Sequence, residues 1–314
     1  MYCVGVDIGG TSIKAGVVDE QGKILKKASV KTDVPAGSHK IISDIGHLVL
    51  SLVDPNDRDF LGIGIGCPGA VNSSTGFIDK AYNLNWTRVP LAEELARIVN
   101  KPIKVSNDAN VAALGETVYG VGRTYSDTIF ITLGTGVGGG IVLNGKLYEG
   151  NEGKGAELGH MVLVVDGEPC TCGRRGCMEA YCSASALIRE TKKAMQADKN
   201  SSMWQYSPTL DDVDGKTAFE CSKNGDAAAN AVVDYFVKYL GEGMLNFANI
   251  FRPQAIILGG GVCAQGDYLI YKLKDYCKDR NYGFWGMPRF DILVAQLGND
   301  AGIIGAAGLI YTSM

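Results

Sequence analysis

The chain has 314 residues, a formal net charge of −4 and 46% hydrophobic residues. Its length exceeds that of a typical single hydrophobic core, so we expect two domains. The slightly acidic composition contains no Lys/Arg run, which argues against nucleic acid as a partner. The first residues enter a strand pattern without the features of a signal peptide, and no segment is long and apolar enough to span a bilayer. We therefore expect a cytoplasmic protein without a membrane partner.

The first elements combine strands with helices. Alternating patterns around glycine turns predict a meander of three strands, and hydrophobic residues at helical spacing predict the helix that follows. In chain order, the expected elements are strands over 2–7, 13–18 and 23–31, a helix over 39–53, a strand over 61–67, a helix over 89–99, a strand over 102–106 and a helix beginning near Ala109. The predicted order is βββαβαβα.

The opening pattern then restarts near the middle of the chain. Residues 131–147 repeat the strand, glycine turn, strand and tight turn of residues 6–24, and the spacing drifts by one residue at each turn. This self-similarity predicts a duplicated unit, although glycine-rich hairpins also resemble one another by chance. Later, we expect helices over 183–197 and 226–249, a strand over 255–258, a helix from Asp267, a strand over 292–296 and a helix from Asp300. The result is two α/β domains with a cleft between them.

Three glycine turns are candidates for binding phosphate. Successive backbone amides in such a turn form a concave donor surface that an anion can approach closely, because no Cβ intervenes. Two of the turns, at 9–11 and 134–136, join strands, and the third, at 259–261, lies between a strand and a helix. The alternative for each turn is an ordinary hairpin.

Two familiar nucleotide motifs fail when their context is considered. Gly134, Gly136 and Gly139 have the spacing of a dinucleotide-binding loop, but the residues that follow predict a strand where that fold requires a helix. The run beginning at Gly140 approaches a P-loop, but Leu147 occupies the position where Ser or Thr must bind magnesium. Neither motif is therefore expected to function.

A zinc site is predicted from four residues in the pattern H-x9-C-x-C-x4-C. His160, Cys170, Cys172 and Cys177 supply one imidazole and three thiolates, a preferred tetrahedral set for Zn²⁺. Four protein ligands leave no open position for water, so the zinc would be structural. The alternatives are a disulfide pair or four unrelated residues. An odd total of nine cysteines favours reduced thiols for the rest.

Several motifs together resemble the ROK (repressor, open reading frame, kinase) family of bacterial sugar kinases, within the actin-like ATPase superfamily. The resemblance covers essentially the whole chain. The motifs are DIGGTSIKAGVVD at 7–19, SNDANVAALGE at 106–116, LGTGVGGGIV at 133–142, GAELGH at 155–160, CTCGRRGCMEAY at 170–181 and ILGGGV at 257–262.

The resemblance implies an α/β fold of two ribonuclease-H-like domains with mixed sheets and an interdomain cleft. A smaller domain would span 1–117, completed by the C-terminal helix 300–314, and a larger domain with the zinc loop would span 118–299. Repressor members of the family carry a helix-turn-helix region ahead of the DIGGT segment. Because Met1 lies almost at the first strand, we expect a kinase.

The resemblance also implies roles for individual residues. Asp108 would be the base that deprotonates the sugar hydroxyl, with helix capping as the alternative. Asp7 would lie near Mg²⁺. The expected sugar contacts are Gly69, Asn107, Asp108, Glu157, His160 and Glu179. The expected ATP contacts are Asp7, Gly9, Gly10, Thr11, Lys14, Gly134, Thr135, Gly136, Gly260 and Gly261.

Some of these assignments compete with simpler roles. Lys14 on a strand is usually only solvated, and an isolated carboxylate is more often part of a surface ion pair. If GAELGH is helical, Glu157 and His160 lie on one face of the helix. His160 would then bind zinc through one ring nitrogen and meet the sugar through the other.

The expected activity is ATP-dependent phosphorylation of the 6-hydroxyl of a hexose, most like the glucokinases of this family. Fructose, mannose, N-acetylmannosamine and N-acetylglucosamine remain alternative substrates, because discrimination depends on the shape of the pocket. A sugar-sensing regulator and a zinc-stapled binding module are non-enzymatic alternatives. The family resemblance also implies a homodimer or homotetramer.

Overall fold

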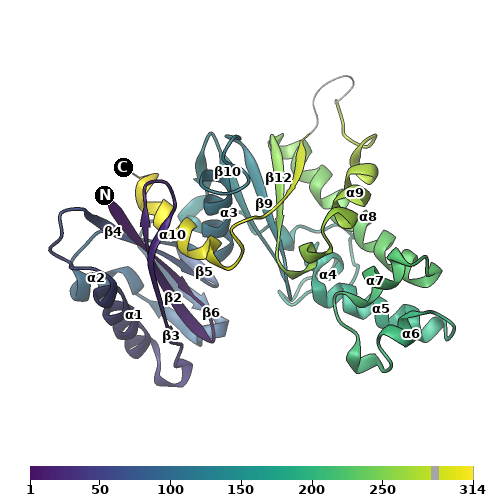
Figure 1. The fold of residues 1–314 in the computed structure, drawn as a ribbon, viewed down its shortest axis with the longest axis horizontal. Helices are drawn as coiled ribbons and strands as arrows, with labels where there is room; N and C mark the ends of the chain where they lie inside the picture. The colour runs from purple at the N-terminus through teal and green to yellow at the C-terminus, as the bar shows by residue number, and fades with distance from the viewer. Residues whose placement is uncertain (284–289, 314) are drawn as a thin grey trace. The chain divides into compact units, whose positions relative to one another are not determined.

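The computed structural model describes residues 1–283 and 290–313, and the chain divides into two compact units (Figure 1). Unit 1 comprises Met1–Phe130, Gly140–Ala156 and Ala295–Met314, and unit 2 comprises Ile131–Gly139 and Glu157–Val294. The chain changes unit four times, and two of these boundaries lie within strands, β9 (Thr128–Leu133) and β10 (Val137–Leu143). Both units are therefore built from segments that are separated in the sequence.

Unit 1 contains a five-stranded mixed sheet in the order β3-β2-β1-β4-β8. The strands are β1 (Tyr2–Ile8), β2 (Ser12–Asp19), β3 (Ile24–Lys31), β4 (Phe60–Cys67) and β8 (Ile103–Asn107). β1, β2 and β3 form the predicted antiparallel meander, while β4 and β8 pair in parallel. The antiparallel register places Asp7 directly opposite Lys14.

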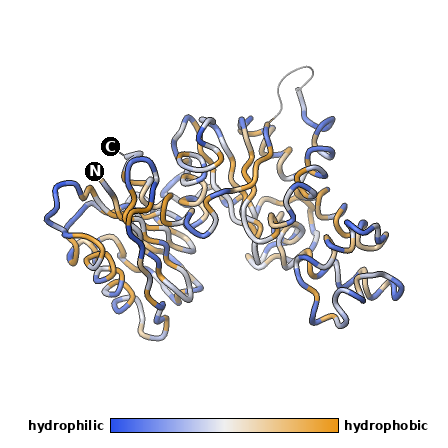
Figure 2. The backbone as a smooth tube through the Cα atoms, in the orientation of Figure 1, coloured by the Kyte–Doolittle hydropathy of each residue, from blue (hydrophilic) through white to orange (hydrophobic). Residues whose placement is uncertain are grey.

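Alternation along β1 divides the core of unit 1 into two layers. Val4, Val6 and Ile8 belong to the cluster that includes helix α1 (Ser38–Leu52) and helix α2 (Leu91–Val99). On the opposite face, Cys3 packs with helix α10 (Ala301–Tyr311). Successive strand residues point to opposite faces, so the sheet is covered on both sides. Figure 2 shows that hydrophobic and hydrophilic stretches also follow one another along the turns of helix α1.

Helix α10 is held between the sheet and helix α3 (Asp108–Val118) by glycines. A Cβ at Gly5 of β1 would lie 1.8 Å from the carbonyl oxygen of Ile303, and one at Gly64 of β4 would lie 1.7 Å from that of Ala306. On the other side, a Cβ at Gly305 would lie 1.7 Å from the carbonyl oxygen of Val111 in α3. The backbones therefore touch directly on both sides of α10, and no larger residue fits at these three positions.

The region between β4 and α2 differs from the prediction. We expected no strand there, but residues 70–89 form a three-stranded antiparallel sheet in the order β5-β6-β7. These strands are β5 (Ala70–Asn72), β6 (Phe77–Ala81) and β7 (Trp86–Val89). They are short, and Asn85 and Arg88 both have positive φ angles, which interrupts the alternation that reveals a strand in a sequence.

The second large sheet has the order β11-β10-β9-β12-β13. Its remaining strands are β11 (Lys146–Tyr148), β12 (Ala255–Gly259) and β13 (Asp291–Val294). The helices of unit 2 are α4 (Glu179–Cys182), α5 (Ala184–Ala197), α6 (Met203–Tyr206), α7 (Thr217–Lys223), α8 (Ala227–Phe251) and α9 (Asp267–Cys277). The mixed sheets with their helices confirm the predicted α/β class.

The repeat seen in the sequence corresponds to two similar hairpins. β1 and β2 enclose the turn at 9–11, and β9 and β10 enclose the turn at 134–136. Strand β10 follows the second turn, and strand β11 (Lys146–Tyr148) follows the P-loop-like run, so neither motif leads into a helix and both alternatives are correctly rejected. Among the described residues, no helix has the length and hydrophobicity needed to cross a membrane.

Candidate active site and metal centre

The turn at 9–11 presents backbone amides that bind no acceptor among the described residues. The Gly9 amide donates to the Ser12 carbonyl oxygen at 3.0 Å, while the Thr32 hydroxyl donates to the Gly9 carbonyl oxygen at 2.7 Å and the Thr32 amide to that of Thr11 at 3.0 Å. Within the described part of the chain, the amides of Gly10 and Thr11 have no hydrogen-bond acceptor, and both residues are exposed. The turn therefore offers free donors on a backbone whose carbonyls are fixed, as an anion site requires.

The turn at 134–136 in unit 2 is built in the same way. Its Gly134 amide donates to the Gly136 carbonyl oxygen at 3.0 Å. The start of α5 holds the other carbonyls, because the Ala184 amide donates to Gly134 and the Ser185 hydroxyl to Thr135, both at 2.8 Å. No acceptor for the Thr135 and Gly136 amides is present among residues 1–283 and 290–313.

The third turn lies between a strand and a helix, as predicted. β12 is followed by a short 3-10 helix, Gly261–Gln265, and α9 begins at the predicted residue, Asp267. Gly260 has a φ of +87°, and a Cβ there would lie 2.4 Å from the Leu133 carbonyl oxygen. A Cβ at Gly261 would meet nothing within 4 Å. Gly260 thus provides close packing, and Gly261 borders open space.

Asp7 is a partly buried carboxylate beside the first turn of α10. A Cβ at Gly302 would lie 2.8 Å from Cγ of Asp7, so only glycine leaves room for the carboxylate there. Burial raises the pKa of Asp7, and the nearby Lys14 acts in the opposite direction. A carboxylate that is costly to ionise without a cation suits the position predicted near Mg²⁺.

Asn107 and Asp108 mark the boundary between β8 and α3. Asn107 caps the helix, because its Oδ1 accepts from the Ala109 amide at 2.9 Å, and its Nδ2 donates to the Gly69 carbonyl oxygen at 3.0 Å. Gly69 has a φ of +99°, and a Cβ would lie 2.2 Å from the Lys80 carbonyl oxygen. Asp108, the first helical residue, is exposed, and its Oδ1 accepts from the Ala109 amide at 2.8 Å. The N-cap position itself therefore belongs to Asn107.

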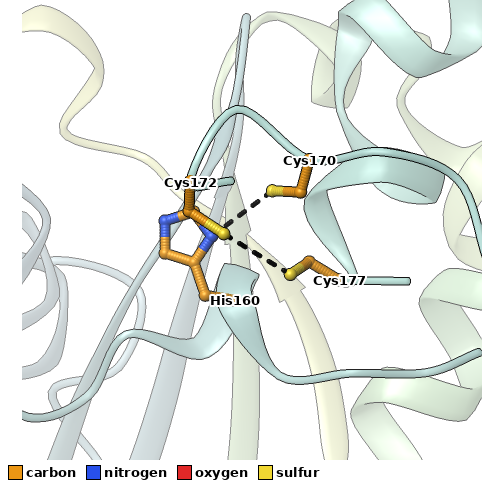
Figure 3. Close-up of side chains that lie close together, drawn as sticks. All are labelled: His160, Cys170, Cys172 and Cys177. Atoms are coloured by element: carbon orange, nitrogen blue, oxygen red, sulfur yellow. Dashed lines mark hydrogen bonds between the residues drawn. The ribbon is translucent and has the colours of Figure 1, made fainter. Parts of the chain in front are cut away.

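His160, Cys170, Cys172 and Cys177 converge on one point, as predicted (Figure 3). Their ligand atoms all lie within 4.8 Å of one another. Nδ1 of His160 is 3.6 Å from Sγ of Cys170, and Sγ of Cys172 is 3.7 Å from Sγ of Cys177. All three cysteines are free thiols, so the disulfide alternative is wrong.

These distances fit a tetrahedral zinc ion. Zn–S and Zn–N bonds of about 2.3 and 2.05 Å at tetrahedral angles place two sulfurs about 3.8 Å apart, and a sulfur and a nitrogen about 3.6 Å apart. The Arg174 amide lowers the pKa of Cys172, whereas burial raises that of Cys170 to about 12. A cation is therefore needed for all three thiols to ionise together. With four ligands present, zinc bound here would supply folding energy and no catalytic water.

The segment around Glu157 does not form the helix on which one prediction depended. Ala156 has a φ of +62°, and only Leu158–His160 forms a turn of 3-10 helix. Glu157 is its exposed N-cap residue, so it and His160 do not share a face of an α-helix. Because Nδ1 of His160 faces the thiols, Nε2 is the ring nitrogen left for another partner.

Glu179 lies next to both the metal loop and the glycine turn of unit 2. Its Oε1 accepts from the Thr171 hydroxyl at 2.6 Å, and its Oε2 accepts from the Val137 amide at 3.1 Å. A Cβ at Gly136 would lie 2.4 Å from the same Oε2.

Comparison with known proteins agrees with this arrangement. A sequence model of the ROK family matches residues 3–313. The chain belongs to the ROK family. A glucokinase of Thermotoga maritima is 36% identical over 312 residues, which cover 98% of this chain and 96% of that protein.

Two solved ROK structures are similar over the whole chain. A ROK family glucokinase from Streptomyces griseus in complex with glucose and AMPPNP has a TM-score of 0.79 and 36% identity, covering 99% of this chain and all of that one. A ROK hexokinase from Thermus thermophilus has a TM-score of 0.84 and 30% identity, covering 100% of this chain and 99% of that one. The predicted family and fold class are confirmed.

Four residues that contact the ROK motifs were not predicted. Thr32, Thr171 and Ser185 hold the turns or the carboxylate beside them through hydroxyl groups. Glu116, the last residue of SNDANVAALGE, is completely buried, and its Oε1 accepts from the Leu297 amide at 2.7 Å. A single hydroxyl carries no sequence signal of its own. Glu116 and Thr171 lie inside two of the quoted motifs, at 106–116 and 170–181, and that position was the available hint.

Proposed function

We propose that this chain is an ATP-dependent hexose kinase that phosphorylates the 6-hydroxyl of glucose. The observation that carries the proposal is the pair of glycine turns, each with fixed carbonyls and two amides that have no acceptor in the described part of the chain. The chain is also similar to glucokinases over nearly its whole length. Free amides on a rigid turn suit the β- and γ-phosphates of ATP. The similarity to a glucokinase solved with glucose and AMPPNP supports the same substrate pair.

Asp108 is the proposed base. In the reaction, the sugar hydroxyl oxygen attacks the γ-phosphorus, the bond from that phosphorus to the oxygen bridging to the β-phosphate breaks, and the hydroxyl proton passes to the Asp108 carboxylate. Its exposure at the start of α3 supports this role, because the carboxylate is accessible and the capping bond is already supplied by Asn107. Asn107 and Gly69, bonded to each other, are the proposed sugar contacts of unit 1.

The remaining residues are assigned to the parts of the two substrates that we expect them to contact. We assign phosphate binding to Gly9, Gly10, Thr11 and Lys14 and to Gly134, Thr135 and Gly136, the adenosine side to Gly260 and Gly261, and the sugar contacts of unit 2 to Glu157, His160 and Glu179. Asp7 is the proposed partner of Mg²⁺, which neutralises phosphate charge. Zinc held by His160, Cys170, Cys172 and Cys177 braces the sugar-binding segment. The proposed assembly is a homodimer or homotetramer, measurable by light scattering.

Asp108→Asn tests the base. We expect kcat to fall roughly 10²- to 10⁴-fold in a coupled assay of ADP release, because the amide cannot accept the proton. Glucose affinity, measured by calorimetry, should change little. Asp33→Asn is the matched control, because Asp33 is exposed and its side chain caps no helix. Near-normal kcat in Asp108→Asn would exclude Asp108 as the base, and a hexose panel in the same assay tests the preference for glucose.

A further inference from the structure

The metal loop and the glycine turn of unit 2 are connected through one carboxylate. Thr171, between the ligands Cys170 and Cys172, donates its hydroxyl to Oε1 of Glu179 at 2.6 Å. Oε2 of the same carboxylate accepts from the Val137 amide at 3.1 Å. Sγ of Cys170 also donates to Oε1 at 3.5 Å, but a thiol that binds zinc gives up this proton. With metal bound, two hydrogen bonds would therefore lead from the metal loop, through Thr171 and Glu179, to the residue that follows the turn at 134–136.

The Val137 amide belongs to the peptide unit that closes the turn. The carbonyl of that unit, on Gly136, accepts from the Gly134 amide at 3.0 Å, and its N–H donates to Glu179. A planar peptide bonded at both ends has little freedom to rotate. Its orientation restricts that of the preceding peptide unit, which carries the Gly136 amide, one of the two donors of this turn that have no acceptor among the described residues. Glu179 therefore helps to set where those donors point.

A second contact joins the other metal-bearing segment to the same residue. A Cβ at Gly159, next to the ligand His160, would lie 2.0 Å from the Val137 carbonyl oxygen. A Cβ at Gly139 would lie 2.6 Å from a methyl carbon of Leu158, so the packing continues along β10. The segments that supply His160 and the three cysteines thus meet Val137 from its carbonyl and its amide side.

We propose that the metal loop positions the phosphate-binding amides of the turn at 134–136 through Thr171 and Glu179, so that the bound metal strengthens nucleotide binding. Thr171 and Glu179 act here as positioning residues. The inference rests on the proposed function, which assigns nucleotide phosphates to this turn. The metal would then influence the binding of the nucleotide as well as that of the sugar. Bound nucleotide would strengthen metal binding by the same factor, because a coupling between two binding sites acts equally in both directions.

The test measures the affinity for the magnesium complex of AMPPNP by calorimetry, in the absence of sugar. Thr171→Val removes the hydroxyl and leaves every metal ligand in place, whereas Thr171→Ser retains the hydroxyl. Thr209→Val is the matched control, because the Thr209 hydroxyl also donates to a carboxylate, that of Asp212, at 2.7 Å. Zinc content and the melting temperature are measured for each variant, so that loss of metal or of folding is detected directly.

We expect Thr171→Val to raise the Kd for the nucleotide roughly 5-fold or more with its zinc content unchanged, and Thr171→Ser to restore wild-type affinity. Thr209→Val should bind as the wild type does. Verified removal of zinc should raise the nucleotide Kd of the wild type. The same removal should raise the Kd of Thr171→Val much less, because this variant already lacks the hydrogen bond from Thr171 to Glu179.

Unchanged nucleotide affinity in a folded, zinc-loaded Thr171→Val protein would overturn the inference, as would a loss confined to glucose affinity. In both cases, a wild type that binds the nucleotide keeps the proposed function intact. If the wild-type, zinc-loaded protein itself fails to bind the nucleotide, the proposed function fails instead, and the inference fails with it.

Discussion

Gly305→Ala tests the packing of α10 against α3. In an isolated helix, replacing glycine with alanine stabilises the folded state by roughly 1 kcal/mol, because glycine loses more backbone entropy on folding. In this protein, the new Cβ would lie 1.7 Å from the Val111 carbonyl oxygen, 2.6 Å from the Val111 carbonyl carbon and 2.9 Å from the Gly115 amide nitrogen. All three atoms belong to the backbone, so no side chain can rotate to relieve the contact.

The gain in helix propensity and the cost of the backbone clash together determine whether Gly305→Ala stabilises or destabilises the protein. Relief of the clash requires the helices to separate by about 1.5 Å, which weakens dispersion contacts along their whole interface. Overpacking of this kind costs about 1–3 kcal/mol and sometimes more, and contact with rigid backbone favours the upper end of the range. After the gain in helix propensity is subtracted, we expect a net loss of about 2 kcal/mol and a fall in Tm of roughly 4–8 °C.

Thermal unfolding followed by circular dichroism measures the change. Gly215→Ala is the control, because a Cβ at Gly215 would meet nothing within 4 Å, and its Tm should remain close to that of the wild type. Because Asp108 is the first residue of α3, Gly305→Ala should also lower kcat. An increase in Tm for Gly305→Ala would show that helix propensity dominates and that the close contact between α10 and α3 is wrong.

Two further predictions concern buried carboxylates. Because burial raises the pKa of Asp7 above its ordinary value of 3.8, ionisation of this carboxylate destabilises the fold increasingly as the pH rises above 3.8, and the cost is complete above the raised pKa. Without Mg²⁺, Asp7→Asn should therefore unfold at a higher urea concentration than the wild type at pH 7. This difference in urea midpoint should shrink as the pH falls towards 3.8, and a difference that does not change with pH would contradict burial of the charge as its cause. Glu116→Ala should lower the free energy of unfolding by roughly 1–3 kcal/mol, since it leaves the partly buried Leu297 and Val121 amides without their acceptor, whereas Glu116→Gln, which keeps one oxygen, should lose less. Equal urea midpoints for Glu116→Ala and the wild type would refute the second prediction.

Features with a local cause could be predicted from the sequence. Helix α1 was expected over 39–53 and spans Ser38–Leu52, because its hydrophobic residues recur at the helical period. The metal cluster was also recognisable, since its four ligands lie within 18 residues and three of them are thiols. The glycine turns could be located for the same reason, although their free amides became evident only from the partners of the carbonyls.

Features that depend on distant or irregular contacts could not be predicted. Glu116 meets Leu297 across 181 positions, and an acidic residue on a helix ordinarily faces water. The interpretation that Glu157 and His160 share a helical face required a helix over 155–160, but the positive φ of Ala156 prevents a regular helix. The small sheet of β5, β6 and β7 has strands of three to five residues, too short for an alternating pattern to stand out.

The position of α10 has a consequence for folding during synthesis. This helix begins at Ala301, yet it covers one face of a sheet whose first strand begins at Tyr2. While the ribosome is still translating the preceding 300 residues, that face has no cover and remains available to chaperones or to other nascent chains. Strands that emerge long before α10 are thus among the last to be fully enclosed.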